Sequence, residues 1–277
     1  MRHKQSMAVI TISRGSFAGG KAVAERLGQK LGQRPLSREA VLAQAAKEYG
    51  VRETDLAETL NAAPHFWQQV PGKRMAYVKC VTAVLFDHAH TDNLLYHGHV
   101  GHLLFAGIAH VLKVRVIADL EHRIQLAMDQ AHLKREAAIA HIHHVDESRR
   151  RWGRLLYGVD WEDPTQYNVI LNIGQISVDG ACATIARMAE LPDFQPTAES
   201  RKRFEDLRLG SRVWATLAKD PTTRSARIDV TADGGEVVIT GNVSSSKALE
   251  LLPRIAGTVE GVKAVRCEAG MGADWYW

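Results

Sequence analysis

Cysteine is rare in this 277-residue chain, and its three residues, Cys80, Cys182 and Cys267, lie far apart. An odd number of scattered cysteines without C-x-x-C spacing excludes a disulfide framework and a zinc finger. The sequence therefore predicts buried thiols in a reducing compartment.

Long apolar runs are also absent. The basic start, MRHKQSM, is followed by an apolar run that already ends at Ser13 and Arg14, and histidines, Lys113 and Arg115 interrupt the apolar region 94–117. Neither a signal peptide nor a membrane-spanning helix is predicted. We expect a cytoplasmic protein.

A strong excess of one charge is missing as well. The net charge is +4, with 45% hydrophobic and 24% charged residues, as in ordinary globular proteins. This excess suits anionic ligands but is too small to indicate nucleic acid binding, which we do not expect. The length allows an α/β core and a second, smaller domain.

The most informative stretch that is present is a glycine-rich loop after the β-branched run Val9–Ile12 and before an amphipathic helical pattern. In this context G-x-x-x-x-G-K binds phosphate, because loop N–H groups and the helix N-terminus face the anion and Lys21 reaches the β and γ phosphates. The residues expected to hold the nucleotide phosphates are Gly15, Ser16, Phe17, Ala18, Gly19, Gly20, Lys21 and Ala22.

The alternative is a strand-to-helix turn that binds nothing, with Lys21 paired to Glu25 one turn later. One departure from the motif matters: Ser or Thr normally follows the lysine to hold Mg²⁺, whereas Ala22 and Val23 stand here. The clean strand before the loop favours the phosphate-binding interpretation.

Later segments alternate between strand and helix patterns, which predicts an α/β fold with a parallel sheet. Ser37 is a good N-cap for a helix over 38–49, and Asp119 ends a predicted strand over 111–118. A carboxylate at that position is typical of a magnesium-water partner, and it is equally typical of a helix N-cap. The two roles are compatible. Gly72–Arg74 is interpreted as a turn before a helix around 75–90.

Two clusters of basic residues have alternative interpretations. His141, His143 and His144 lack the i, i+4 spacing of a zinc site, so we predict a solvated helix end and no metal site. Four arginines between Arg149 and Arg154 are either a solvated basic helix or a site for phosphate oxygens, which the guanidinium group binds in bidentate fashion.

These pieces, in this order, resemble the cytidylate kinase-like family of P-loop nucleoside monophosphate kinases over roughly residues 8–190. The matching segments are ITISRGSFAGGKAVAERLGQKLG, SREAVLAQAAKEYGV, VLKVRVIADLEHRI and DESRRRWGRLLYGVDWEDPTQYNVILNIGQIS. The resemblance implies a three-layer P-loop kinase fold, ATP and Mg²⁺ as cofactors, and nucleotide substrates.

The resemblance also implies residue roles. Lys21 and the lid arginines Arg149 and Arg151 would be catalytic, and Arg38, His99 and Asp119 would bind the substrate. The family usually has an arginine where His99 stands, and a histidine carries charge only when it is protonated.

A composition change at residues 192–202 predicts a linker between a kinase-like domain (1–191) and a second domain (203–277). An αββαβ pattern with the hairpin DGGEVVITGNV resembles a BON domain over roughly residues 203–268. Such domains bind phospholipid or other ligands. The partner of this domain could therefore be a small ligand, a lipid or a protein. We favour the interpretation that the domain is a regulatory or oligomerising appendage. The aromatic tail 275–277 is expected to dock on a surface. A cut after about residue 195 is expected to leave a soluble kinase domain.

We expect an ATP-dependent kinase of nucleoside monophosphates, with CMP or dCMP favoured as the acceptor. The alternative is a degenerate kinase domain that senses nucleotide without catalysis and signals through the BON domain, which Ala22, Val23 and His99 favour. A third hypothesis, that the protein binds nucleic acid or membrane surfaces, is supported only by the arginine cluster and the positive net charge.

Overall fold

The computed structural model describes residues 8–54, 71–90, 93–98 and 101–272. Its contacts divide these residues into two compact units. The first contains residues 8–40, 93–98 and 101–197, and the second contains residues 41–54, 71–90 and 198–272. Each unit is described separately below.

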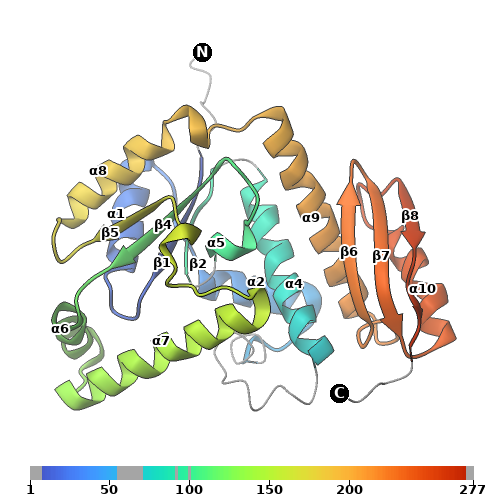
Figure 1. The fold of residues 1–277 in the computed structure, drawn as a ribbon, viewed down its shortest axis with the longest axis horizontal. Helices are drawn as coiled ribbons and strands as arrows, with labels where there is room; N and C mark the ends of the chain where they lie inside the picture. Colours follow the sequence, from blue (N-terminus) through green and yellow to red (C-terminus); the bar gives the residue numbers. More distant parts are fainter. Residues whose placement is uncertain (1–7, 55–70, 91–92, 99–100, 273–277) are drawn as a thin grey trace. The chain divides into compact units, whose positions relative to one another are not determined.

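The first unit is built on a parallel sheet with strand order β2-β3-β1-β4-β5. Its strands are β1 (Val9–Arg14), β2 (Leu36–Ser37), β3 (Leu95–His97), β4 (Val111–Ile117) and β5 (Val169–Asn172) (Figure 1). The fold class predicted from the sequence is confirmed. Because all strands run in the same direction, the loops that follow them gather at one edge of the sheet.

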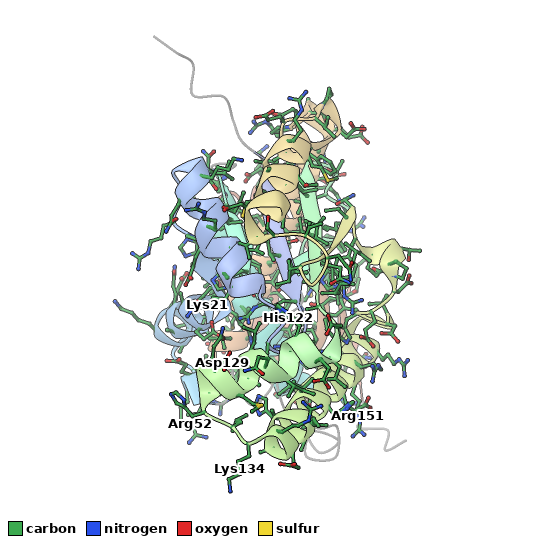
Figure 2. All side chains as sticks on the ribbon, turned by 90° about the vertical axis from the view of Figure 1, so that its left-hand side faces the viewer. Lys21, Arg52, His122, Asp129, Lys134 and Arg151 are labelled. Atoms are coloured by element: carbon green, nitrogen blue, oxygen red, sulfur yellow. The ribbon has the colours of Figure 1, made fainter. Side chains whose placement is uncertain are left out.

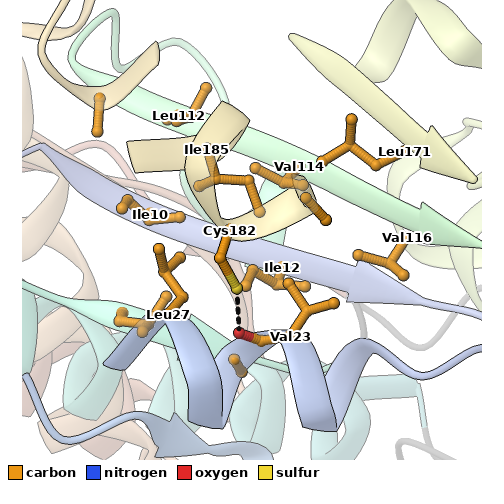
Figure 3. Close-up of a cluster of buried hydrophobic side chains, with 14 of the residues drawn as sticks. Ile10, Ile12, Val23, Leu27, Leu112, Val114, Val116, Leu171, Cys182 and Ile185 are labelled. Carbon is orange, nitrogen blue, oxygen red and sulfur yellow. Dashed lines mark hydrogen bonds between the residues drawn. The ribbon is translucent and has the colours of Figure 1, made fainter. Parts of the chain in front are cut away.

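One face of this sheet carries the apolar core (Figure 3). Ile10 and Ile12 of β1 pack there against helices α1 (Gly20–Leu31) and α8 (Val178–Ala189). Cys182 is buried in this core, and its Sγ lies 3.5 Å from the carbonyl oxygen of Val23. All three cysteines are free thiols; Cys80 and Cys182 are buried as the sequence predicts, whereas Cys267 is only partly buried.

The opposite face of the sheet is polar. Thr11 and Ser13 of β1 pair in register with Lys113 and Arg115 of β4, so the four side chains share this face. The short helix α5 (Gly101–Leu104) covers part of it, and His102 of α5 hydrogen-bonds the hydroxyl of Ser13 at 2.8 Å.

Helices α6 (Leu120–Ala131) and α7 (Arg135–Tyr157) follow β4 and pack on each other through Ile124, Ala127, Ala138 and Ile142. The three histidines 141, 143 and 144 lie inside α7 rather than at a helix end, because α7 continues to Tyr157. His143 and His144 are exposed, as is His141. The 3₁₀ helices η2 (Pro164–Gln166) and η3 (Pro192–Phe194) complete this unit.

The second unit combines helices from both halves of the chain. Helix α2 (Arg38–Tyr49) contributes all but its first three residues, and α4 (Pro71–Ala89) packs along α9 (Ala198–Lys219). Helix α4 begins at Pro71, so Gly72–Arg74 belong to its first turn and not to a preceding turn. Helix α9 begins at Ala198, inside the segment that the sequence predicts as a linker.

The C-terminal part of the second unit is a small sheet of β6 (Arg227–Asp233), β7 (Glu236–Val243), β8 (Ala264–Cys267) and β9 (Gly270–Met271), with α10 (Ser246–Ala256) packed against it (Figure 1). The hairpin between β6 and β7 turns at Gly234 and Gly235, whose φ angles are 57° and 100°. Positive φ at both positions is typical of the tight hairpin turn that the sequence predicts. Strand β9 is not predicted.

In the part of the chain that the structure describes, no helix is long and apolar enough to cross a membrane. The aromatic tail 275–277 lies outside the described residues.

Candidate phosphate-binding site

The glycine-rich loop follows β1 directly and enters α1. Gly19 has a φ of 70°, and a Cβ at this position would lie 2.1 Å from the Cδ1 of Ile173. At Gly20 a Cβ would lie 2.6 Å from the side chain of Arg14. Glycine is therefore required at both positions, at Gly19 for its backbone conformation and at both for close approach.

Lys21 lies at the start of α1 with a side chain that is 67% exposed. Its Nζ atom is 3.8 Å from Glu25, so the ion pair considered from the sequence exists. Exposed pairs of this kind contribute at most about 1 kcal/mol. Lys21 is therefore available to an incoming phosphate, and the next residue, Ala22, presents only a methyl group to solvent.

Residues from α6 and α7 clamp the first part of the loop. The Ser16 N–H donates to Asp146 at 3.1 Å, and Arg123 donates to the Ser16 carbonyl at 2.7 Å. Arg123 also donates to Asp146 at 2.5 Å. Phe17, with a φ of 54°, packs against the α6–α7 apolar cluster and lies edge-on to His141. Helices α6 and α7 thus fix the loop through the backbone of Ser16 and the side chain of Phe17.

Arginines converge where the loop leaves β1. Arg149 of α7 donates to the carbonyl of Arg14 at 2.8 Å, and only 16% of its side chain is exposed. Burial, together with the nearby positive charges of Arg14, Arg38 and Arg123, lowers the pKa of Arg149 to about 10, against the opposing effect of Asp146. Burial also lowers the pKa of Arg14 and of Arg38. The carboxylates of Asp146 and Glu39 oppose these shifts, yet the pKa of each arginine remains lowered, so a bound anion would stabilise the charged guanidinium groups.

Arg38 reaches this cluster from the first turn of α2. Ser37 caps that helix as predicted, since its hydroxyl accepts from the N–H of Ala40 at 3.2 Å. A Cβ on Gly98 would lie 2.9 Å from the Cβ of Arg38, which shows that β3 and the start of α2 are in close contact. His99, predicted to bind the acceptor, lies outside the described residues.

Arg151 does not join the cluster. Its Nε donates to Glu147 at 2.8 Å, and its side chain is 49% exposed. In Figure 2, Lys21 and Arg151 lie well apart, at the start of α1 and out on α7. Its neighbour Arg150 also pairs with acidic residues, Glu147 and Glu162. The arginine-rich segment is therefore mixed: Arg149 faces the loop, and Arg150 and Arg151 form ion pairs on the helix surface.

Asp119 acts as the N-cap of α6, because its Oδ1 accepts from the N–H of His122 at 2.9 Å. Its second oxygen would lie 2.8 Å from a Cβ on Gly174, and the side-chain oxygen of Asn172 would lie 3.2 Å from the same atom. Two oxygens thus gather where β4 and β5 end. Within the described residues no group of three or more His, Cys, Asp or Glu side chains is arranged to hold a metal ion.

Sequence reasoning missed three members of this site: Arg14, Arg123 and Asp146. Arg14 stands directly before the glycine loop, so its position was a usable signal. Arg123 and Asp146 gave no comparable signal, because their partner Ser16 lies 107 and 130 residues away in the chain.

A comparison with known families matches residues 9–175 to the cytidylate kinase-like family. The chain belongs to this family. Residues 205–269 match the BON domain. The cytidylate kinase-like family thus accounts for the loop, the start of α2 and the arginines of α7, and the BON domain accounts for the C-terminal sheet.

Individual relatives agree with the family. A cytidylate kinase of Ignicoccus hospitalis is 25% identical over 182 residues, which cover 66% of this chain and 99% of that protein. The crystal structure of an uncharacterized protein from Eubacterium ventriosum is 15% identical, with a TM-score of 0.50, and covers 66% of this chain and 98% of its own. At 15% identity, the Eubacterium ventriosum structure supports only the fold of this chain.

The BON domain also contains a groove of about 280 Å³ at the α9 side of the β6–β7 hairpin. Its cations already have partners within the second unit. Lys202 contacts Asp206 at 2.8 Å, and Lys263 donates to the carbonyl of Gly234 at 2.9 Å. The groove's lysines thus already have partners, and its lining indicates no particular ligand.

Proposed function

We propose that this protein transfers a phosphoryl group from ATP to a nucleoside monophosphate, with CMP or dCMP as the acceptor. The observation that carries the proposal is the meeting of Arg14, Arg38 and Arg149 beside the glycine-rich loop. Burial lowers the pKa of Arg149 and of Arg38, and neighbouring arginines lower both further, so the charged forms of these groups would be stabilised by a multivalent anion such as two phosphates brought together. The family and the cytidylate kinase relative support this acceptor class.

In this proposal the loop N–H groups and Lys21 hold the phosphates of ATP, and Arg38 holds the phosphate of the acceptor. Arg149 stabilises the negative charge that spreads over the transferring group, which is the main contribution a protein makes to phosphoryl transfer. Arg151 contributes only if α7 rearranges, because it pairs with Glu147 here.

Mg²⁺ is expected to accompany ATP, but the described side chains do not form a direct site for it. Ala22 offers no hydroxyl, and one oxygen of Asp119 is used by the helix cap. The ion would therefore be held by the nucleotide phosphates and by water, with Asp119 and Asn172 as outer contacts. We assign no further step to it.

A second candidate function is non-catalytic nucleotide sensing. The contact between Asp146 and the N–H of Ser16 favours it, because a carboxylate already occupies a loop donor, and Ala22 favours it as well. Under this alternative the chain binds nucleotide but does not turn it over.

A coupled ADP-release assay with ATP, Mg²⁺ and each common nucleoside monophosphate tests the proposal, with calorimetric titration of the same nucleotides in parallel. Turnover with CMP or dCMP above the other acceptors is expected. Binding without turnover would instead support the sensor. Absence of both binding and turnover would contradict the phosphate-binding assignment itself.

For the BON domain we propose a regulatory or oligomerising role, with a small ligand, a lipid or a protein partner as the other options. The paired charges of its groove give no reason to prefer one ligand class. Light scattering coupled to size exclusion, with and without CMP and ATP, would show whether the full chain self-associates.

A further inference from the structure

His97 is the last residue of β3, and its position is unusual for a histidine. In the parallel sheet it pairs with Ile12 of β1 and with Ser37 of β2. Ile12 is followed by Ser13 and Arg14, which lead into the glycine loop. Ser37 is followed by Arg38, the first residue of α2. His97 therefore lies at the sheet edge between the donor side and the acceptor side of the candidate site.

One nitrogen of the His97 ring is buried without a hydrogen-bond partner among the described residues. This nitrogen is Nδ1, and only 6% of the residue is exposed. Leaving a buried ring nitrogen unpaired is unfavourable, because the nitrogen has lost its hydrogen bond to water. A residue that only filled space in the core would avoid this cost by being apolar, so the histidine indicates a partner that arrives from solution.

Charged groups face His97 from three elements. Arg14 comes from β1, Lys21 and Glu25 come from α1, and Glu39 comes from the first turn of α2. Burial is the largest effect and lowers the pKa of His97, and Arg14 and Lys21 lower it further, against Glu39 and Glu25. The imidazole is therefore neutral near pH 7 in the ligand-free protein.

We propose that His97 binds the phosphate of the acceptor nucleoside monophosphate and takes up a proton from solvent as it does so. This inference rests on the proposed function, since it names a further residue of the same acceptor site. The ring then donates an N–H to a phosphate oxygen, and one proton moves from solvent to the imidazole without any covalent change. The ligand class is a phosphomonoester dianion rather than a carboxylate or a neutral sugar. Arg14 and Lys21 face the ring, and Arg14 belongs to the same arginine cluster as Arg38 and Arg149, whose guanidinium groups bind phosphate oxygens in bidentate fashion.

Protonation of His97 couples acceptor binding to pH. The pKa of His97 is low in the empty site and rises when the dianion binds, so the complex holds more protons than the free protein between the two pKa values. Acceptor affinity therefore weakens as pH rises through that interval, by up to about tenfold per pH unit.

The test is calorimetric titration of CMP into the full chain at pH 7.0, in two buffers with different ionisation heats. The difference in heat measures the protons taken up. We expect wild type to take up more protons than His97→Val, and the pH dependence of the CMP dissociation constant to be flatter in the variant. CMP has its own phosphate pKa near 6, and comparison with the variant subtracts that contribution.

Three comparisons make the assignment specific. ADP, which occupies the donor side, should take up equal numbers of protons in wild type and in His97→Val. His102→Asn, which changes another buried histidine in contact with Ser13, should retain the His97-dependent uptake. NMR of labelled histidine in wild type should show the His97 ring becoming doubly protonated on addition of CMP, and this readout does not require the variant to fold.

Equal proton uptake by wild type and His97→Val, or a His97 ring that stays neutral with CMP bound, would overturn the inference. Loss of the uptake in His102→Asn to the extent seen in His97→Val would also overturn it. These results presuppose that CMP binds. If neither CMP nor ADP binds wild type, the proposed function fails instead, so the two failures are distinguishable.

Discussion

Asp146 shows how single residues balance charge in this site. Its carboxylate accepts from Arg123 and from the N–H of Ser16, and it lies 3.9 Å from Arg149. Removing this charge leaves partly buried guanidinium groups facing each other, and such losses are larger than those of surface ion pairs.

Asp146→Asn is therefore expected to lower the free energy of unfolding by roughly 1–3 kcal/mol. Inorganic phosphate should stabilise this variant more than wild type, because the anion replaces the missing charge. Thermal unfolding with increasing phosphate measures both effects, and Asp129→Asn, an exposed aspartate that contacts Gln125, is the matched control. Identical phosphate responses in wild type and Asp146→Asn would argue against an anion site among these arginines.

Lys21 can be removed with little effect on stability, because among the described residues it forms a weak, exposed ion pair with Glu25. Lys21→Ala is expected to abolish phosphoryl transfer while changing the free energy of unfolding by no more than about 1 kcal/mol. Lys30→Ala, in the last turn of the same helix, should leave transfer unchanged. Normal turnover in Lys21→Ala would remove the loop from the catalytic site.

His102 should make the fold sensitive to acid. Burial lowers its pKa to about 3, with smaller effects from Lys113 and Arg115. Unfolding restores a pKa near 6.5, so the unfolded state binds more protons below that pH and stability falls as pH drops from about 6.5 toward 3. The loss due to His102 approaches about 1.4 kcal/mol per pH unit.

His102→Asn should therefore flatten the plot of unfolding free energy against pH between 6.5 and 4.5, even though it disturbs the bond to Ser13. Urea unfolding at each pH provides the measurement. The exposed His143→Asn should keep the wild-type slope. An unchanged slope in His102→Asn would assign the acid sensitivity to other groups.

At the scale of elements, the strand β1, the glycine loop and α1 form one conformational unit. Gly19 and Gly32 flank α1 with almost the same backbone, φ 70° and φ 64°. A Cβ at Gly19 meets Ile173, whereas nothing lies within 4 Å of a Cβ at Gly32. The two positions thus separate the cost of the left-handed conformation from the cost of displacing the loop.

Gly32→Ala is expected to cost about 1–2 kcal/mol and to leave ATP binding intact. Gly19→Ala should cost more and should also weaken ATP binding, since either the loop or Ile173 must move. Urea unfolding and ATP titration of both variants give the comparison. Equal losses at the two positions would mean that the contact with Ile173 has no energetic consequence.

At the scale of the whole molecule, α4 and α9 are the important pair. Phe86 of α4 packs against Phe204 of α9 with ring centroids 4.9 Å apart and the ring planes tilted by 41°, and Arg208 donates to Asp87 at 2.6 Å. His90 contacts Glu205 at 2.8 Å. A helix from the first half of the chain thus shares its packing with the helix that begins the C-terminal domain.

These contacts change the expected result of a cut after residue 195. We now expect that chain to aggregate or unfold at a lower temperature, because Phe86, only 1% exposed, loses its partner. Phe86→Gln should improve the solubility of the shortened chain but destabilise the full chain by roughly 2–4 kcal/mol. A monomeric shortened chain with an unchanged melting temperature would show instead that residues up to 195 fold independently.

The sequence alone determined the local structure. The β-branched run 9–12, Ser37 as a cap, Asp119 at the end of β4 and the glycine pair 234–235 each act over a few residues, and the structure has the strand, the caps and the turn at these positions. The fold class followed from the order of these elements, because parallel strands joined by helices allow few arrangements.

Only the tertiary structure decided which arginines face the phosphate loop. It also decided that His97 is buried beside them. Arg149 and Arg151 are two residues apart, yet one turns toward Arg14 and the other pairs with Glu147, because successive positions on a helix point in different directions. The packing of α4 on α9 was equally invisible, since apolar faces identify buried helices without naming their partners. Contacts between residues more than a hundred positions apart depend on the complete fold, and local pattern carries no information about them.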